Sequence, residues 1–575
     1  MWLLSPRVFL TTRRRRHAGK AYEYLDIAES HRVDGKVRRT TLWTLGRRDQ
    51  IDPDKIKGLI RLLQQLVSAE GASAMQIGGL EIASVREYGV VFAARQLWHE
   101  LGLDKMLAEI PHRKAVAVEE AVFRMVVNRL VEPESKLGLC DFEDEYGNLH
   151  RGWQGKVHWP SAGGDLDYHH YLRAMDVIHP HRQALEDKIF GRVTDLFSLP
   201  LRLVLYDLTS TYFEGEGVCE LAEYGYSRDH RDDRSQVVIG LAVTQEGIPI
   251  THRVYKGSTA DVSTFAPMAE ELRRRFGLQE TVIVADRGMF SQDNVADLQN
   301  SGQRYILALR ARQQTEGPIA LQLALKAGLP RPTELDSPWQ VREVEVIPNF
   351  RHLVVYSAFK ASHDFAVRAR RIRRALTDLA TLKGQVAKGK MERDRIIERA
   401  TKILVTHKCN RFITVGYGQV SIEFRIDRQE YREQRRHDGV FVLETNHPSL
   451  TSEEIVASYR QLQEVERAFR VLKSLIKLRP VFHHRDRRVE THIFICGLAF
   501  LIGKLMELKL RRSGSTVSIA HALEQLRDLR VVEYTWDNFT VARTTKPDPE
   551  VAALLKSLGI DLGNPVLSVR PPAAA

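Results

Sequence analysis

Cysteine is scarce in this chain. It occurs four times in 575 residues, always far from the next copy, at Cys140, Cys219, Cys409 and Cys496. Disulfide frameworks and cysteine-based zinc sites need closely spaced pairs, so both are excluded as organising features. The scarcity is typical of a protein from a reducing compartment, and we expect a cytoplasmic location.

Long hydrophobic runs and an excess of acidic residues are also lacking. The most apolar stretch, residues 493–503, is too short to cross a bilayer and is closed by Lys504, so it predicts a buried helix and no membrane span. There are 73 acidic residues against 85 Lys and Arg, which leaves a net charge of +12 and a pI near 9.4. A basic protein attracts polyanions, so the composition favours a nucleic-acid partner.

The chain does contain three acidic residues in segments typical of phosphodiester chemistry. LVLYD and VIVAD are β-branched, apolar runs that end on Asp207 and Asp286, so both carboxylates are expected at the C-terminal edges of buried strands. Glu466 lies in a helical segment. Three carboxylates can hold two Mg²⁺ ions, with Mn²⁺ as a substitute, because Mg²⁺ is a hard cation that takes oxygen ligands and leaves positions for phosphate oxygens. The sequence therefore predicts a metal-dependent site at Asp207, Asp286 and Glu466.

The helix that carries Glu466 has one apolar stripe. Its members recur at steps of three and four and are Leu462, Val465, Phe469, Leu472 and Ile476. A strip beside the stripe holds Tyr459, Glu466, Lys473 and Lys477, with Arg470 next to it. Thr451 and Glu454 predict a capping box at the helix start. Glu466 is thus expected at the edge of a buried face, and the alternative is that it is a solvated charge on an amphipathic helix. Glu464, on the same helix, is the other candidate for the third acid of the site.

This segment resembles the Y-x(2)-R-x(3)-E-x(6)-K signature of bacterial insertion-sequence DDE transposases of the IS-four superfamily. Tyr459, Glu466 and Lys473 match three fixed positions, whereas Leu462 stands at the arginine position, so Arg460 or Arg470 is the candidate for the missing cation. Further segments are similar to the long subgroup, which carries a large insertion before its glutamate. They are YDLTSTYF, KGSTAD at 256–261, VADRGMF, HDGVFVLETN at 437–446 and RPVFHHRDRRVETHIF at 479–494.

The resemblance implies a function. The catalytic and metal-binding residues would be Asp207, Asp286 and Glu466, and the DNA-binding residues would be Tyr459, Arg470 and Lys473. The activity implied is Mg²⁺-dependent cleavage at the terminal inverted repeats of a bacterial element, followed by strand transfer into target DNA, by a homodimer on paired ends. Two alternatives remain: a nuclease or resolvase that only hydrolyses DNA, and an inactive derivative that binds DNA without cutting it.

The pattern of elements predicts an α/β protein with a ribonuclease H-like mixed sheet. Strands are expected at 201–207, 281–286 and 304–310, a hairpin at 237–257 turning at Glu246–Gly247, and helices at 261–276 and from Ser291 to Gly302. The expected regions are a basic N-terminal hairpin or arm (1–80), a mainly helical N-terminal region for DNA end binding (81–198), the catalytic core (199–310 and 446–510), a mixed α+β insertion (311–445) and a C-terminal tail (511–575).

Two basic stretches and one acid complete the expectations. The first fifty residues hold 12 Lys and Arg against 5 Asp and Glu, around a hairpin signal at Asp34–Gly35, and residues 360–402 hold 13 against 5. Both favour contact with DNA, the alternatives being a solvated hairpin and a solvated helix. Asp261 is expected to start a helix and not to bind metal.

Overall fold

The structure is a computed structural model. It describes residues 7–17, 20–33, 36–47, 81–113, 116–143, 149–150, 152–160, 166–199, 201–215, 219–277, 281–309, 316–328, 339–388, 391–419, 421–536 and 539–570. The chain divides into two compact units. One comprises residues 1–85, 531–545 and 564–575, and the other comprises residues 86–530 and 546–563. No helix among the described residues is both long and apolar enough to span a bilayer.

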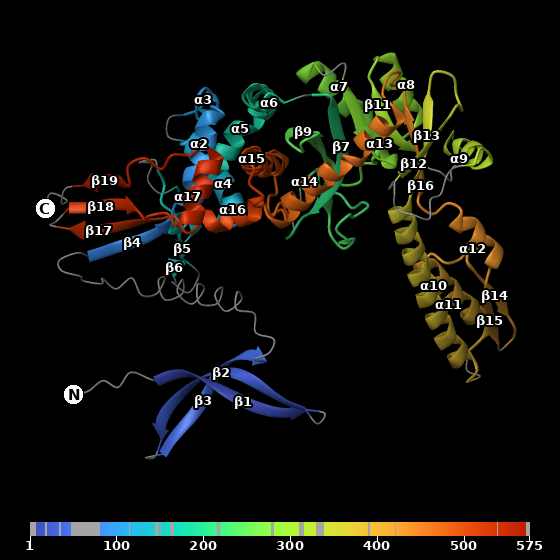
Figure 1. The fold of residues 1–575 in the computed structure, drawn as a ribbon, viewed down its shortest axis with the longest axis horizontal. Coiled ribbons are helices and arrows are strands. Elements are labelled where there is room, and N and C mark those ends of the chain that lie inside the picture. Colours follow the sequence, from blue (N-terminus) through green and yellow to red (C-terminus); the bar gives the residue numbers. More distant parts are fainter. Residues whose placement is uncertain are drawn as a thin grey trace. The chain divides into compact units, whose positions relative to one another are not determined.

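An eight-stranded mixed sheet forms the centre of the larger unit (Figure 1). Its order is β12-β13-β16-β11-β10-β7-β8-β9. Five strands follow the ribonuclease H arrangement and are β7 (Leu203–Tyr212), β8 (Gln236–Thr244), β9 (Pro249–Lys256), β10 (Val282–Ala285) and β11 (Tyr305–Leu309). The first three form an antiparallel meander, and β10 and β11 then continue parallel to β7. The predicted ribonuclease H-like mixed sheet is confirmed.

The hairpin between β8 and β9 turns where the sequence predicted. Gly247 has a φ of 77°, the left-handed conformation that glycine adopts without a steric penalty. Helix α8 (Gln292–Asn300) also begins as predicted, because the Ser291 side chain accepts a hydrogen bond from the Asn294 backbone N–H.

Strand β7 is longer than the sequence predicted. It was expected to end at Asp207 but continues to Tyr212, pairing throughout with β8. The residues after Asp207 include two threonines and an aromatic, which suit a sheet as well as the apolar run before them. Asp207 therefore lies in the middle of a strand and not at its edge.

Strand alternation decides which way Asp207 faces. Tyr206 and Leu208 belong to the hydrophobic core that packs against α7 (Val262–Phe276) and α8. Because successive side chains point to opposite faces of a sheet, Asp207 faces the other side. That side is covered by α14 (Leu462–Ser474), which contacts β7 and β8. The carboxylate of β7 and the helix of Glu466 thus share one face.

The single helix predicted from Thr451 onward is two helices. The capping box of Thr451 and Glu454 is present, but α13 (Ser452–Arg460) stops and α14 starts after a turn at Gln461. Helix α13 packs on β10, β11 and β12, whereas α14 packs on β7 and β8. The two halves follow different strands of the sheet, which a single straight helix would not do.

The insertion adds three strands to the sheet and a helical arm. The strands are β12 (Trp339–Val344), β13 (Arg351–Ser357) and β16 (Val440–Thr445). The insertion arm, residues 358–438, contains α10 (Ala358–Val386), α11 (Arg393–Thr406), β14 (Ile413–Tyr417), β15 (Ile422–Ile426) and α12 (Arg428–Arg435). It has a hydrophobic core of its own, in which α10 packs on α11. At its base the Ser357 N–H donates to the Gly439 carbonyl at 2.9 Å.

Helices make up most of the rest of the larger unit. They are α2 (Gly89–Glu100), α3 (Leu103–Ala108), α4 (Val118–Val131), α5 (Tyr168–Ile178), α6 (Arg182–Phe197), α9 (Glu316–Lys326), α15 (Asp486–Arg512), α16 (Ile519–Leu526) and α17 (Pro549–Leu558). A two-stranded sheet is formed by β5 (Phe142–Glu143) and β6 (Leu149–His150). The apolar stretch at 493–503 lies within α15 and is buried there, as predicted.

Two small sheets involve the chain ends. The first is an antiparallel sheet of β1 (Arg7–His17), β2 (Lys20–Val33) and β3 (Lys36–Arg47). The predicted pairing across Asp34–Gly35 is present between β2 and β3, although the two turn residues and the helix expected at 52–68 lie outside the described residues. The second contains β4 (Glu81–Glu87), β17 (Arg530–Trp536), β18 (Phe539–Thr544) and β19 (Val566–Arg570).

Candidate active site

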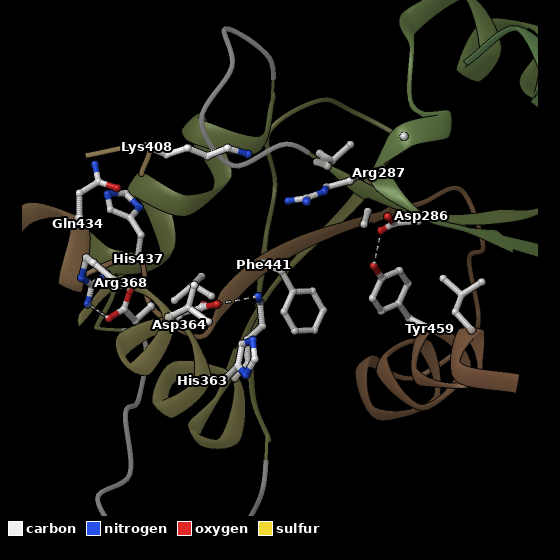
Figure 2. A pocket seen from close by; sticks show the side chains of 18 of the residues that line it. Asp286, Arg287, His363, Asp364, Arg368, Lys408, Gln434, His437, Phe441 and Tyr459 are labelled. Atoms are coloured by element: carbon white, nitrogen blue, oxygen red, sulfur yellow. Dashed lines mark hydrogen bonds and ion pairs between the residues drawn. The ribbon is translucent and has the colours of Figure 1, made fainter. Parts of the chain in front are cut away.

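The three predicted acids line one cavity of about 1380 Å³. Asp207 comes from β7, Asp286 follows β10 directly, and Glu466 comes from α14. Tyr459 of α13 lines the same cavity. Figure 2 shows Asp286 and Tyr459 on one side of this cavity. The sheet and the α13–α14 pair therefore bring residues up to 259 positions apart in the sequence to a single cavity.

Asp207 is held in an unfavourable place for a negative charge. Burial, with the nearby charges of Asp286 and Glu466 as smaller causes, raises the pKa of its carboxyl from 3.8 to about 7. Two contacts work in the other direction: the Leu208 backbone N–H donates to Oδ1 at 2.8 Å, and the positive charge of Arg228 lies nearby. The balance leaves an excess of negative charge that an additional cation would offset.

Asp286 is positioned by a tyrosine. The Tyr459 hydroxyl donates a hydrogen bond to Asp286 Oδ1 at 3.0 Å (Figure 2). Burial, followed by the charge of Asp286, raises the pKa of the tyrosine hydroxyl well above its usual value, so it remains a donor. The tyrosine matched to the signature thus touches an acid of the predicted triad.

Glu466 points into the cavity while its helix is anchored on the other side. All five residues of the predicted apolar stripe are buried. Glu466 itself is exposed to the cavity, whereas Glu464 lines a different pocket with Gln245 and Lys504 and pairs with Arg467. The geometry therefore favours Glu466 over its nearest rival.

The predicted DNA-binding cations are less uniform. Lys473 is partly buried, and its Nζ donates to Asp229 Oδ1 at 2.8 Å, while Arg479 pairs with the same carboxylate. Burial lowers the pKa of Lys473, and Asp229 partly counteracts this effect. Arg470 is exposed but does not line the cavity.

Of the two candidates for the cation missing at Leu462, only Arg460 lines the cavity. Its guanidinium lies over the Trp339 ring, 5.0 Å from the centroid. Leu462 is largely buried in the apolar stripe and gives the cavity an apolar surface at the position where the signature has an arginine.

Arg228 and Asp261 are site residues that the sequence reasoning missed. Arg228 donates to Asp261 Oδ1 at 2.6 Å, and both line the cavity. Asp261 was expected to start a helix, and it does precede α7, but its carboxylate makes no capping hydrogen bond there and binds Arg228. The densely charged segment RDHRDDR between two strands was the available signal for Arg228.

The cavity suits a divalent cation in its chemistry but is not preorganised in its spacing. The three acids offer carboxylate oxygens, which are the ligands that a hard cation such as Mg²⁺ prefers. The negative charges of Asp286 and Glu466 raise the pKa of Asp207, and a bound cation would offset them. Among the described residues, however, no three His, Cys, Asp or Glu side chains are close enough to hold one metal ion together. Asp207, Asp286 and Glu466 are the residues that would hold it.

Comparison with known proteins assigns the chain to a family. Residues 199–502 match the transposase DDE domain, and residues 10–74 match the N-terminal domain of IS1634 family transposases. The insertion-sequence assignment predicted from the sequence is thus confirmed, but the N-terminal match is to IS1634 and not to the IS-four superfamily. No curated protein matches the chain in sequence.

Two solved structures are similar to it at low identity. One is described as the cryo-EM structure of the piggyBac transposase synaptic complex with hairpin DNA, at 10% identity and a TM-score of 0.37, covering 76% of this chain and 79% of that one. The other is the Mos1 transposase paired-end complex with left transposon end, at 13% identity and a TM-score of 0.15, covering 48% and 74%. The match of the transposase DDE domain to more than half of the chain identifies this protein as a DDE transposase.

Proposed function

We propose that this protein moves an insertion sequence by cut-and-paste transposition. It would cleave DNA at the terminal inverted repeats of the element and join the freed 3′ ends to target DNA. The observation that carries the proposal is the meeting of Asp207, Asp286 and Glu466 at one cavity, from β7, the end of β10 and α14. The IS1634-type N-terminal region fits a bacterial or archaeal host, and we place the protein in the cytosol with the nucleoid.

DDE transposases use divalent metal ions, and we propose two Mg²⁺, replaceable by Mn²⁺, at the three acids. When bound, such ions activate a water or a 3′-hydroxyl and stabilise the leaving oxygen of an in-line displacement. The chain itself supplies the arrangement of the ligands: β7 fixes Asp207, Tyr459 orients Asp286 through its hydroxyl, and the buried stripe of α14 aims Glu466 at the cavity.

Basic residues near the acids would hold the DNA strand. Arg470 presents an exposed cation on α14 for a backbone phosphate, and phosphate contacts position a strand without reading its sequence. Tyr459 would position Asp286 beside the scissile phosphate. Lys473 would contribute to DNA binding partly indirectly, because its hydrogen bond to Asp229 links the segment of Asp229 to α14. A homodimer that holds two ends together is the proposed assembly.

The test uses the purified protein, DNA from the flanks of its reading frame, and a supercoiled target plasmid. Cleaved ends and joined products that depend on Mg²⁺ are expected with the unaltered protein. Asp207→Ala, Asp286→Ala and Glu466→Ala should each abolish both products while end binding persists, and Glu464→Ala is the matched control that should retain them. Full cleavage by Glu466→Ala would overturn the assignment.

The joined product distinguishes the proposal from its main rival. A metal-dependent nuclease or resolvase with the same acids would hydrolyse the ends without joining them to the plasmid. Supplying pre-cleaved ends isolates this second step, because joining then needs no prior cleavage. An inactive derivative would bind the flanks and give neither product.

A further inference from the structure

The cavity of the three acids has a second wall, which the insertion arm provides. Its lining residues from the arm include Lys360, Arg371, Lys408 and Arg411. Lys360 and Arg371 lie on α10, and Lys408 and Arg411 lie in the turn between α11 and β14. The arm thus adds a set of cations to the cavity, and the three acids lie on the core side together with Arg228, Arg287 and Arg460.

The two carboxylates on the arm side of the cavity, Asp364 and Asp438, already have partners within the arm and at its base. Arg368 and Asp438 form a buried pair, with Nη1 donating to Oδ1 at 2.6 Å. Asp364 accepts from the Gly439 backbone N–H at 3.0 Å and lies 3.4 Å from Lys360 Nζ. Figure 2 labels Arg368 and Asp364 and draws a dashed line from each of these side chains to a partner. These contacts neutralise the carboxylates of this wall and leave its other cations uncompensated.

Arg371, Lys408 and Arg411 are exposed and form no ion pair within the described part of the chain, and the same is true of Arg287 on the core side. In Figure 2 the Lys408 ammonium and the Arg287 guanidinium point toward one another from opposite sides of the cavity. Two like charges that face the same space repel each other, and an anion between them reverses that effect.

The backbone of Lys408 supports a role for this side chain. Its φ is 54°, the left-handed conformation, at the position after α11 that glycine most often fills. A lysine costs about 1–2 kcal/mol more than glycine there. The lysine places a cation over the cavity where the shape of the turn alone would favour glycine.

The size of the cavity indicates what kind of anion it accepts. Its volume of about 1380 Å³ exceeds the roughly 300–1,000 Å³ of sites for small molecules. Cations that line an open space of this size suit consecutive phosphates of one chain better than a single small anion. The acids on the opposite wall are the ones assigned to the reaction.

We propose that Arg371, Lys408 and Arg411 of the insertion arm, together with Arg287 of the core, bind the phosphodiester backbone of the DNA strand that crosses the active-site cavity. The strand then lies between the arm and the core, with its backbone on the basic wall and the reacting phosphate toward Asp207, Asp286 and Glu466. This inference rests on the proposed function for the identity of the DNA.

The first experiment compares two triple charge reversals within the same arm. Arg371→Glu/Lys408→Glu/Arg411→Glu changes the basic wall. Arg373→Glu/Arg374→Glu/Arg399→Glu is the matched control, because these arginines are exposed on α10 and α11 but do not line the cavity. Both variants change the net charge by the same amount, so any difference between them is local.

The measurement is the salt dependence of binding to a fluorescein-labelled duplex taken from the element's flanks, without divalent metal. Loss of three phosphate contacts should reduce the slope of log K against log salt by roughly 2.7. The control triple variant should keep the slope of the unaltered protein. Equal slopes for the two triple variants would overturn the proposal.

The second experiment locates the contact by crosslinking. All four native cysteines are buried, so a cysteine introduced by Lys408→Cys is accessible to an aryl azide label whereas the native ones are not. Photolysis should attach the label at this position to the DNA strand, and Arg374→Cys should give background only. Equal yields at the two positions would refute the proposal.

Both readouts are independent of catalysis. They are made without metal and are repeated with Asp207→Ala, which removes an acid of the reaction but none of the basic wall. If the protein never cleaves DNA but the slopes and crosslinks differ as expected, the proposed function fails and this inference stands. If it cleaves DNA and both comparisons give no difference, the inference alone fails.

Discussion

Replacing Asp207 with asparagine should stabilise the metal-free protein while it destroys the proposed activity. Asp207 lies mid-strand on β7 beside Asp286 and Glu466, and burial together with these two charges makes ionisation unfavourable. Asparagine has nearly the same shape and carries no charge. The acid that the reaction needs is therefore one that the fold tolerates at a cost.

The size of that cost follows from the pKa of Asp207. Folding raises it from 3.8 to about 7, and a shift of about 3 units at about 1.4 kcal/mol each corresponds to about 4 kcal/mol. For an acid whose folded pKa is raised, the cost is complete above the folded pKa and disappears below the unfolded pKa. Partial exposure of the side chain makes this the upper figure.

The assay is urea unfolding followed by tryptophan fluorescence, with EDTA, near pH 8 and near pH 4. The free energy of unfolding of Asp207→Asn should exceed that of the unaltered protein by up to about 4 kcal/mol near pH 8, and by less than about 1 kcal/mol near pH 4, close to the unfolded pKa. Asp297→Asn, at an exposed position on α8, is the control and should change the free energy of unfolding by no more than about 0.5 kcal/mol at either pH.

Added Mg²⁺ gives a further check. It should narrow the gap near pH 8, because a cation at the three acids stabilises the folded unaltered protein more than the variant. A gap that is larger near pH 4 than near pH 8 would refute the electrostatic reasoning, and a gap that Mg²⁺ leaves unchanged would refute the assignment of these acids as its ligands.

Two further changes test charges buried elsewhere. Asp229→Asn removes the carboxylate shared by Lys473 and Arg479 and should destabilise the protein by roughly 3–5 kcal/mol; a double-mutant cycle with Lys473→Met should show coupling of about 0.5–3 kcal/mol, and additivity would contradict the contact. Lys136 is buried, its Nζ has no hydrogen-bond partner among the described residues, and burial lowers its pKa from 10.5 to about 7. Lys136→Met should therefore raise the urea midpoint near pH 7, and the gain should shrink toward pH 10, where the unfolded chain also begins to lose this proton; a gain that grows with pH would contradict this.

Features that depend on neighbouring residues were predictable from the sequence. The capping box at Thr451, the glycine turn at Gly247 and the strand that ends just before Asp286 each need only a few adjacent residues to form. The apolar stripe of α14 follows from the helical period alone. Together they located the acids on the elements that carry them.

Features that depend on tertiary packing were not predictable. The extent of β7 past Asp207 is set by pairing with β8, and the break at Gln461 is set by the strands on which the two helices rest. Lys473 meets Asp229 across 244 residues, so no local pattern announces the pair. The same is true of the cation that faces the cavity: Arg460 lines it, and Arg470 does not.

The hydrogen bond between Ser357 and Gly439 has a consequence for how this enzyme could change over time. The arm leaves and rejoins the sheet at two residues that are already bonded, so its length does not alter the distance that the backbone must bridge. A short turn joining these positions would close the sheet by the same bond. In evolution, residues 358–438 could therefore be lengthened, replaced or lost while the strands on either side of them keep their pairing in the sheet.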